Sequence, residues 1–124
     1  MKHHDPQHMQ ANRAARSSLA EALLAMKTAE EMRALLKDLT TPAELEAMVD
    51  RWRVVRYLDQ GKPYREIHDI TGVSVTTIGR VARYLEHGNG GYRMALERLK
   101  DESRNGDEAK SITPRRQGAR NAKE

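Results

Sequence analysis

The side chains best suited to chemistry in this chain are hydroxyl, cationic and small apolar groups that gather between residues 62 and 83. Serine and threonine hydroxyls can bond base edges in the DNA major groove, valine can pack on a thymine methyl group, and lysine, arginine and histidine can hold phosphates. The candidate DNA-contacting residues are Lys62, Arg65, His68, Ser74, Val75, Thr76, Thr77, Gly79 and Arg83. Of these, the expected base readers are Val75, Thr76 and Thr77. We expect no enzyme, because no histidine, carboxylate and nucleophile converge at a recognisable spacing and no glycine-rich phosphate loop follows a strand.

Two short helices joined by a tight turn must position these side chains, and the pattern runs from about residue 63 to residue 86. Gly72 lies at the turn, where a left-handed backbone is easiest without a Cβ atom. Ser74 can cap the second helix by accepting a hydrogen bond from its first turn. The apolar residues that can close both helices over one core are Ile67, Val73, Ile78 and Val81. This is the pattern of a helix-turn-helix, whose second helix enters the major groove.

Two positions depart from the usual pattern of that motif. His68 stands where a small residue is usual, and Thr71 stands where an apolar residue is usual. The alternative is therefore a helical protein-interaction module that does not read DNA. Gly79 in mid-helix costs about 1 kcal/mol relative to alanine, which indicates either close approach to DNA or a ligand, or a packing requirement.

Composition indicates one small domain and a polyanionic partner. The chain has 124 residues, 38% of them apolar and 32% charged, with no Phe and a single Trp. A helical core of this kind often needs a second chain to bury enough area. The net charge of +4 favours binding to a polyanion.

The absence of cysteine excludes thiol catalysis, disulfides and Cys-ligated zinc. No apolar run is long enough to cross a bilayer and no signal-peptide pattern opens the chain, so we expect a cytoplasmic protein. Three histidines, His3, His4 and His8, could chelate a metal loosely, but a mobile start is the better interpretation, and no metal site is predicted.

The expected organisation is a flexible N-terminus over residues 1–14, a helical domain over residues 15–100 and a disordered charged tail over residues 101–124. One helix is predicted after Ser17 and Ser18, and a second from Thr28, which forms a capping box with Glu31. Both are short, and we expect them to pack against another subunit.

The clearest helix start is Thr41-Pro42-Ala43-Glu44, and this third helix should end near Gly61. Its predicted apolar face comprises Leu45, Met48, Val49, Trp52, Val55 and Leu58. After the glycine-rich break at residues 87–91, a last helix is predicted from residue 92 to about residue 100.

The region from Leu39 to about Leu99 resembles the Trp repressor superfamily, and most closely its YerC/YecD branch. The residues that carry the resemblance are Leu39-Thr40-Thr41-Pro42-Ala43-Glu44, Arg51, Arg53, Gly61-Lys62, Tyr64-Arg65-Glu66-Ile67, Thr77-Ile78-Gly79-Arg80-Val81, Tyr84-Leu85-Glu86-His87-Gly88-Asn89 and Tyr92-Arg93-Met94-Ala95-Leu96. The resemblance implies an all-α fold of about six helices in an intertwined homodimer. It also implies a sequence-specific transcriptional regulator, expected to be a repressor, on a roughly palindromic double-stranded operator.

The resemblance also implies a small-molecule pocket. In the Trp repressor two arginines sandwich the indole of bound tryptophan; Arg51 and Arg80 fall on those positions, and Thr41 falls on a further contact. The family has a glycine directly after the second arginine and a serine one turn later, where this chain has Val81 and Tyr84. Both are larger and would intrude on an indole, so we expect no tryptophan there. The residues leave open a different small corepressor, a pocket that Tyr84 fills itself and, as the less favoured alternative, a tryptophan-responsive repressor.

Overall fold

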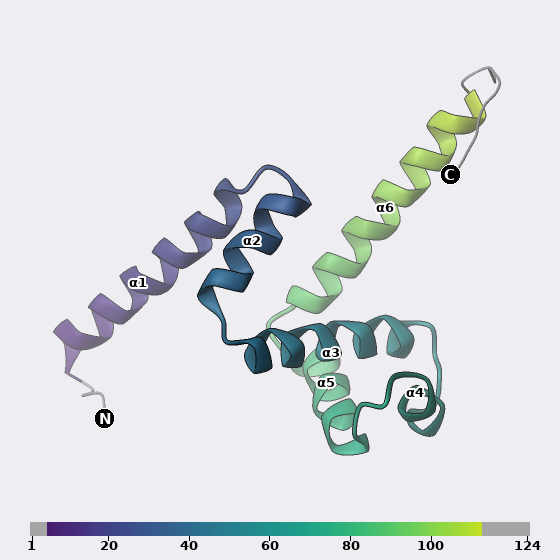
Figure 1. Cartoon of the computed structure of the whole chain (residues 1–124), viewed down its shortest axis with the longest axis horizontal. Helices are drawn as coiled ribbons and strands as arrows, with labels where there is room; N and C mark the ends of the chain where they lie inside the picture. The colour runs from purple at the N-terminus through teal and green to yellow at the C-terminus, as the bar shows by residue number, and fades with distance from the viewer. Residues whose placement is uncertain (1–4, 113–124) are drawn as a thin grey trace. The chain divides into compact units, whose positions relative to one another are not determined.

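The computed structural model describes the backbone of residues 5–112 and the side chains of residues 5–104. Over this part of the chain the fold is all-α, as predicted, with no strand (Figure 1). The helices are α1 (Pro6–Ala25), α2 (Ala29–Leu39), α3 (Pro42–Asp59), α4 (Tyr64–Thr71), α5 (Val75–His87) and α6 (Gly91–Ile112). None of them is long and apolar enough to span a membrane. The chain divides into one unit up to Val49 and a second unit from Asp50 onward.

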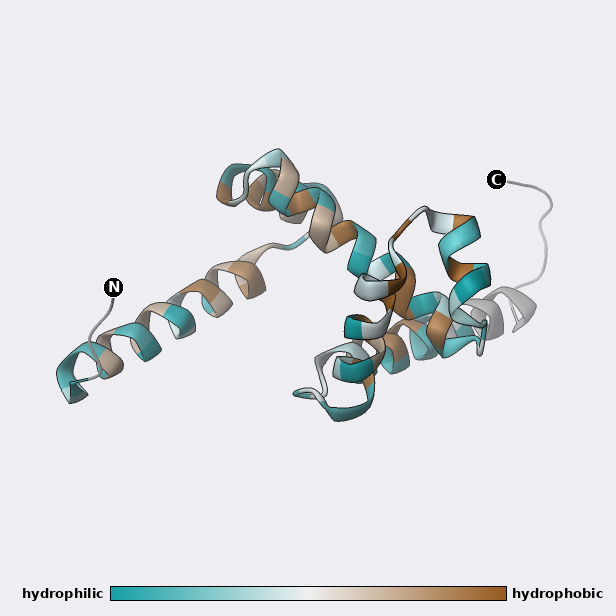
Figure 2. Ribbon diagram, turned by 90° about the horizontal axis from the view of Figure 1, so that it is seen from below, coloured by the Kyte–Doolittle hydropathy of each residue, from teal (hydrophilic) through white to brown (hydrophobic). Residues whose placement is uncertain are grey.

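The N-terminal unit contains helices with clear starts but no buried residue. Asp5 Oδ1 accepts the His8 backbone N–H at 2.8 Å and so caps α1, with Pro6 in its first turn. Thr28 caps α2 by accepting the Glu31 N–H at 3.0 Å. Along the N-terminal helix, hydrophobic and hydrophilic residues are interspersed (Figure 2). No residue of α1 or α2 is buried, and Leu24 is 84% exposed.

Three expectations for this region need correction. The predicted flexible stretch over residues 1–14 is helical from Pro6 onward, because the Asp5-Pro6 pair is itself a helix start. Ser17 and Ser18 consequently lie inside α1 and cap nothing. The capping box at α2 is also partial, since the Glu31 carboxylate accepts the Lys27 N–H at 2.7 Å instead of the Thr28 N–H.

Helix α3 has the predicted boundaries. At its start Thr41 N–H donates to Glu44 Oε1 at 2.8 Å, and Glu44 N–H donates to Thr41 Oγ1 at 3.1 Å, which is a complete capping box. At its end Gly61 adopts a φ of 84° and the Lys62 N–H reaches back to the Tyr57 carbonyl at 3.2 Å. This is the Schellman arrangement, which glycine favours because the position is left-handed.

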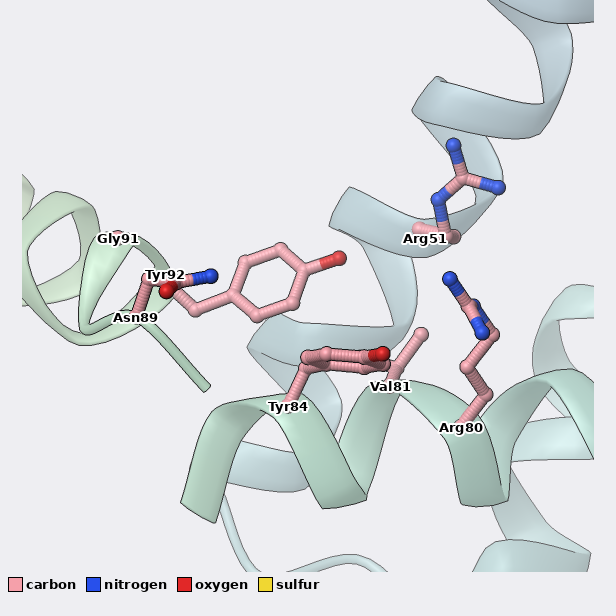
Figure 3. A pocket seen from close by; sticks show the side chains of 7 residues that line it. All are labelled: Arg51, Arg80, Val81, Tyr84, Asn89, Gly91 and Tyr92. Carbon is pink, nitrogen blue, oxygen red and sulfur yellow. The ribbon is translucent and has the colours of Figure 1, made fainter. Parts of the chain in front are cut away.

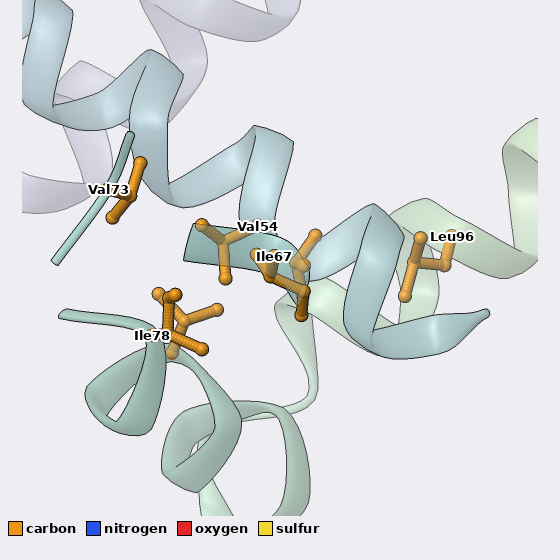
Figure 4. Packing of buried hydrophobic residues seen from close by; sticks show 7 residues of the cluster. Val54, Ile67, Val73, Ile78 and Leu96 are labelled. Atoms are coloured by element: carbon orange, nitrogen blue, oxygen red, sulfur yellow. The ribbon is translucent and has the colours of Figure 1, made fainter. Parts of the chain in front are cut away.

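The core of the C-terminal unit joins α3, α4, α5 and α6. Its buried residues are Val54, Val55, Ile67, Val73, Ile78, Val81 and Leu96. Figure 4 shows these side chains converging between the helices. The four residues predicted for the helix-turn-helix core are all among them. Val54 was not predicted; it belongs to the same buried cluster as Val55, so α3 buries a wider arc than one apolar stripe.

Helix α6 continues well beyond its predicted end at residue 100. Its first part is held to α3, because Leu96 is buried and Asp59 pairs with Lys100 at 2.8 Å and with Arg93 at 3.8 Å. Farther along, Asp101 and Arg104 form an i,i+3 ion pair at 3.0 Å. The prediction that disorder begins at residue 101 is therefore wrong up to Ile112. The rest of the predicted tail, residues 113–124, lies outside the described residues.

Candidate DNA interface and adjoining pocket

The turn between α4 and α5 is held by hydrogen bonds from the two residues that depart from the motif pattern. Gly72 adopts a φ of 77°, as predicted, and its N–H donates to the His68 carbonyl at 2.8 Å. Thr71 Oγ1 donates to the Ile67 carbonyl at 2.7 Å and accepts the Val73 N–H at 3.1 Å. His68 Nδ1 lies 2.8 Å from the Val73 carbonyl, which can only accept, so we assign the proton to Nδ1. Both residues therefore stabilise the turn.

The start of helix α5 is capped by the hydroxyl of Ser74, which also bonds to the hydroxyl of Thr77. Ser74 Oγ accepts the Thr77 N–H at 3.1 Å, which is the predicted cap, and its own hydroxyl donates to Thr77 Oγ1 at 3.1 Å. Thr77 is half-buried, whereas Thr76 is exposed and its hydroxyl has no hydrogen-bond partner among the described residues. Thr76 is therefore the first-turn hydroxyl best placed to meet a base.

The outward face of α5 lies opposite its core face. Ile78 and Val81 are buried, so at 100° per residue the opposite side carries Thr76, Gly79 and Arg83. Arg83 is exposed and forms no ion pair with another described residue. A Cβ atom added at Gly79 would lie 3.9 Å from Tyr64 Cε2, which is ordinary contact. Packing therefore does not require glycine at this position.

Lys62, just before α4, and Arg65, within α4, differ in how free their charges are to bind a phosphate. Lys62 Nζ lies 3.4 Å from Glu66 Oε2, so part of its charge is already compensated. Arg65 is exposed and has no ion-pair partner in the described part of the chain. Of the two, Arg65 is the better candidate for a phosphate contact, because an unpaired guanidinium loses no internal interaction on binding.

A cavity of about 370 Å³ lies between α3, α5 and the start of α6. It is lined by Arg51, Arg80, Val81, Tyr84, Asn89, Gly91 and Tyr92. Four of the five residues predicted for a ligand pocket are thus brought together. The fifth, Thr41, is absent from the lining, and its hydroxyl caps α3. Asn89, Gly91 and Tyr92 were missed; their position in the glycine-rich break before the last helix was the available signal.

Two aromatic residues, Tyr84 and Tyr92, form part of the wall of this cavity. The Arg80 guanidinium carbon lies 4.9 Å from the centroid of the Tyr84 ring, a cation–π contact. The Tyr92 ring projects from the start of α6 toward the same space as Arg51 and Arg80 (Figure 3). Tyr84 is 43% exposed and forms part of the wall of this cavity.

The chemistry of this lining suits an anion. It contains two guanidinium groups and no carboxylate, and neither Arg51 nor Arg80 forms an ion pair with a described residue. Guanidinium groups bind carboxylate and phosphate through paired hydrogen bonds. Among the described residues, no group of three or more His, Asp or Glu side chains could hold a metal ion. His3 and His4 lie outside the described residues.

Comparison with known proteins agrees with this architecture. A sequence profile described as Trp repressor protein matches residues 15–100. The uncharacterized protein YerC of Bacillus subtilis is 40% identical over 83 residues, which cover 67% of this chain and 80% of YerC. A solved TrpR-like protein from Eubacterium eligens superposes with a TM-score of 0.67 at 34% identity, covering 70% of this chain and 90% of that one. A solved structure from Staphylococcus aureus gives a TM-score of 0.67 at 36% identity, covering 70% and 87% of the two chains.

Proposed function

Because the chain belongs to the Trp repressor family, we propose that it is a sequence-specific transcriptional repressor that binds double-stranded DNA as a homodimer. The observation that carries the proposal is the outward face of α5. Thr76 and Arg83 are exposed there without internal partners, behind a turn that is fixed by hydrogen bonds. A preorganised turn and a free helix face are what major-groove reading requires.

The N-terminal helices support the homodimer. Neither α1 nor α2 buries a residue, yet Met9, Leu19, Leu24 and Leu39 are exposed. Apolar area removed from water stabilises by about 25 cal/mol per Å², so a second copy would gain from covering these side chains. A dimer would present two copies of α5 to successive major grooves, and the operator would be a palindrome with half-sites one turn apart.

We also propose that DNA binding does not depend on tryptophan. Val81 and Tyr84 occupy the wall of the pocket, and no lining carboxylate is available to pair with the ammonium group of an amino acid. A small organic anion fits the two guanidinium groups better. The fold itself supplies the turn geometry through Thr71 and His68, so a corepressor is not needed to form it.

The alternative of a protein-interaction module without DNA reading no longer has a specific observation in its favour. It rested on His68 and Thr71 as departures from the motif. Since both residues hydrogen-bond across the turn, they are compatible with a working helix-turn-helix.

The test is a binding-site selection from a random duplex pool at near-physiological salt, run with and without tryptophan. We expect the same palindrome to be enriched in both arms. Enrichment only with tryptophan would contradict our interpretation of Val81 and Tyr84. No enrichment in either arm, repeated with small organic anions added, would contradict sequence-specific DNA binding.

A further inference from the structure

The first turn of α5 presents an apolar surface at the position that should enter the groove. Val75 is the first residue of the helix and is 52% exposed. Exposing the apolar side chain of Val75 to water is unfavourable, and no described residue covers it. Next to it stands Thr76, which adds a methyl group as well as a hydroxyl.

The polar groups around Val75 are largely committed to the protein itself. The hydroxyls of Ser74 and Thr77 bond to each other at the cap, and the Thr71 hydroxyl bonds across the turn. One turn later Gly79 has no side chain at all. Arg80, the first long polar residue of the helix, lies over the Tyr84 ring. The leading end of α5 therefore offers few free hydrogen-bonding groups.

We propose that α5 selects its operator mainly by contact with thymine 5-methyl groups, with Val75 as the specificity-determining residue. This rests on the proposed function. The thymine methyl is the apolar group that protrudes into an unmodified major groove, whereas most other groups that the bases present there are hydrogen-bond donors or acceptors. A valine placed against those polar edges would leave them without water or partner, which penalises the wrong base.

Gly79 contributes to the same mode of reading. A base pair beside the first turn must approach the helix closely for a side chain as short as valine to touch it. The missing side chain at Gly79 leaves that approach open, and packing gives no other reason for glycine there. Thr76 would add a second methyl contact and its free hydroxyl would bond an adjacent base edge.

The experiment uses the selected operator and the full-length protein. Each thymine is replaced by deoxyuridine, symmetrically in both half-sites, which removes only the methyl group. One buried methyl group corresponds to about a fourfold change in affinity, so a symmetric replacement should weaken binding about fifteenfold at the contacted position. Fluorescence anisotropy titration measures the dissociation constants.

Two variants connect the effect to the residue. Val75→Ala should lose most of the thymine preference at the position that Val75 contacts, because that apolar contact is reduced. Leu99→Ala is the matched control, since it truncates a comparably exposed apolar residue on another helix and should keep the full thymine preference. Circular dichroism checks that both variants fold, which is expected because neither residue is buried.

The outcomes separate this inference from the proposed function. Specific binding to the operator without any sensitivity to uracil would overturn the thymine-methyl inference and leave DNA recognition intact. A uracil effect that Val75→Ala retains in full would overturn the assignment to Val75. Absence of specific binding to any duplex would overturn both proposals.

Discussion

At the scale of single residues, a substitution at Gly79 should change stability and operator affinity in opposite directions. The position is inside α5 and an added Cβ would meet only Tyr64 Cε2 at 3.9 Å. Gly79→Ala should therefore raise the free energy of unfolding by about 1 kcal/mol, since alanine favours a helix interior. The same methyl group should reduce operator affinity, because it projects from the face that approaches DNA. Urea denaturation and anisotropy titration measure the two effects; a variant that is stabilised and binds normally would show that DNA does not approach here.

Thr71 and Thr76 form a matched pair of threonines with opposite expected behaviour. Thr71→Val removes a hydroxyl that makes two hydrogen bonds, one of them to the Val73 N–H, and should lower the free energy of unfolding by about 2 kcal/mol. Thr76→Val removes an exposed hydroxyl with no internal partner and should change stability by no more than about 0.5 kcal/mol. Equal losses in urea denaturation would contradict the role of Thr71 in the turn.

At the scale of elements, α4 and α5 should divide the work of binding. Arg65→Ala on α4 should weaken binding to all duplexes alike and reduce the salt slope of log K by about one, because it removes one phosphate contact. Thr76→Ala on α5 should relax sequence preference instead. Titrations over a salt series on operator and scrambled duplexes distinguish the two, with Arg98→Ala on α6 as a surface-charge control. An equal loss of specificity from both variants would argue against this division.

What the sequence could predict at this scale followed from local signals. The cap at Ser74, the left-handed Gly72 and the capping box at Thr41 each depend on residues within four positions of one another, and all three are confirmed. Val54 is buried in a cluster that also contains residues of other helices, so the period of α3 alone could not identify it. The end of α6 was missed because a highly charged stretch lacks apolar periodicity even where helical pairs such as Asp101–Arg104 form.

The same distinction applies to the candidate site. The residues of the ligand pocket on α3 and α5 were identified by resemblance. Tyr92 enters from α6, and the position of that helix depends on its ion pair with Asp59 of α3 and on the burial of its own Leu96. Thr77 was expected to read bases, but its bond with Ser74 is a rotamer choice that sequence does not reveal. The sequence alone therefore could not show that the Thr76 hydroxyl is free to bind a base and that the Thr77 hydroxyl is not.

At the scale of the whole molecule, the proposed dimer depends on apolar residues that the single chain leaves in water. Leu24 is the strongest example, because it is 84% exposed near the end of a helix with no buried residue. Leu24→Glu should shift the protein from dimer to monomer, since a carboxylate placed in an apolar interface loses its hydration without gaining a partner. Sedimentation equilibrium gives the mass directly.

Leu24→Met is the matched control, because it keeps an apolar side chain of similar volume and should remain a dimer. Loss of the dimer should also reduce operator affinity far more than affinity for an isolated half-site, because two linked recognition helices gain from effective concentration and one does not. A monomeric Leu24→Glu protein that still binds the full palindrome with wild-type affinity would mean that α1 plays no part in positioning the two copies of α5. A Leu24→Glu protein that stays dimeric would place the interface on other surfaces of the chain.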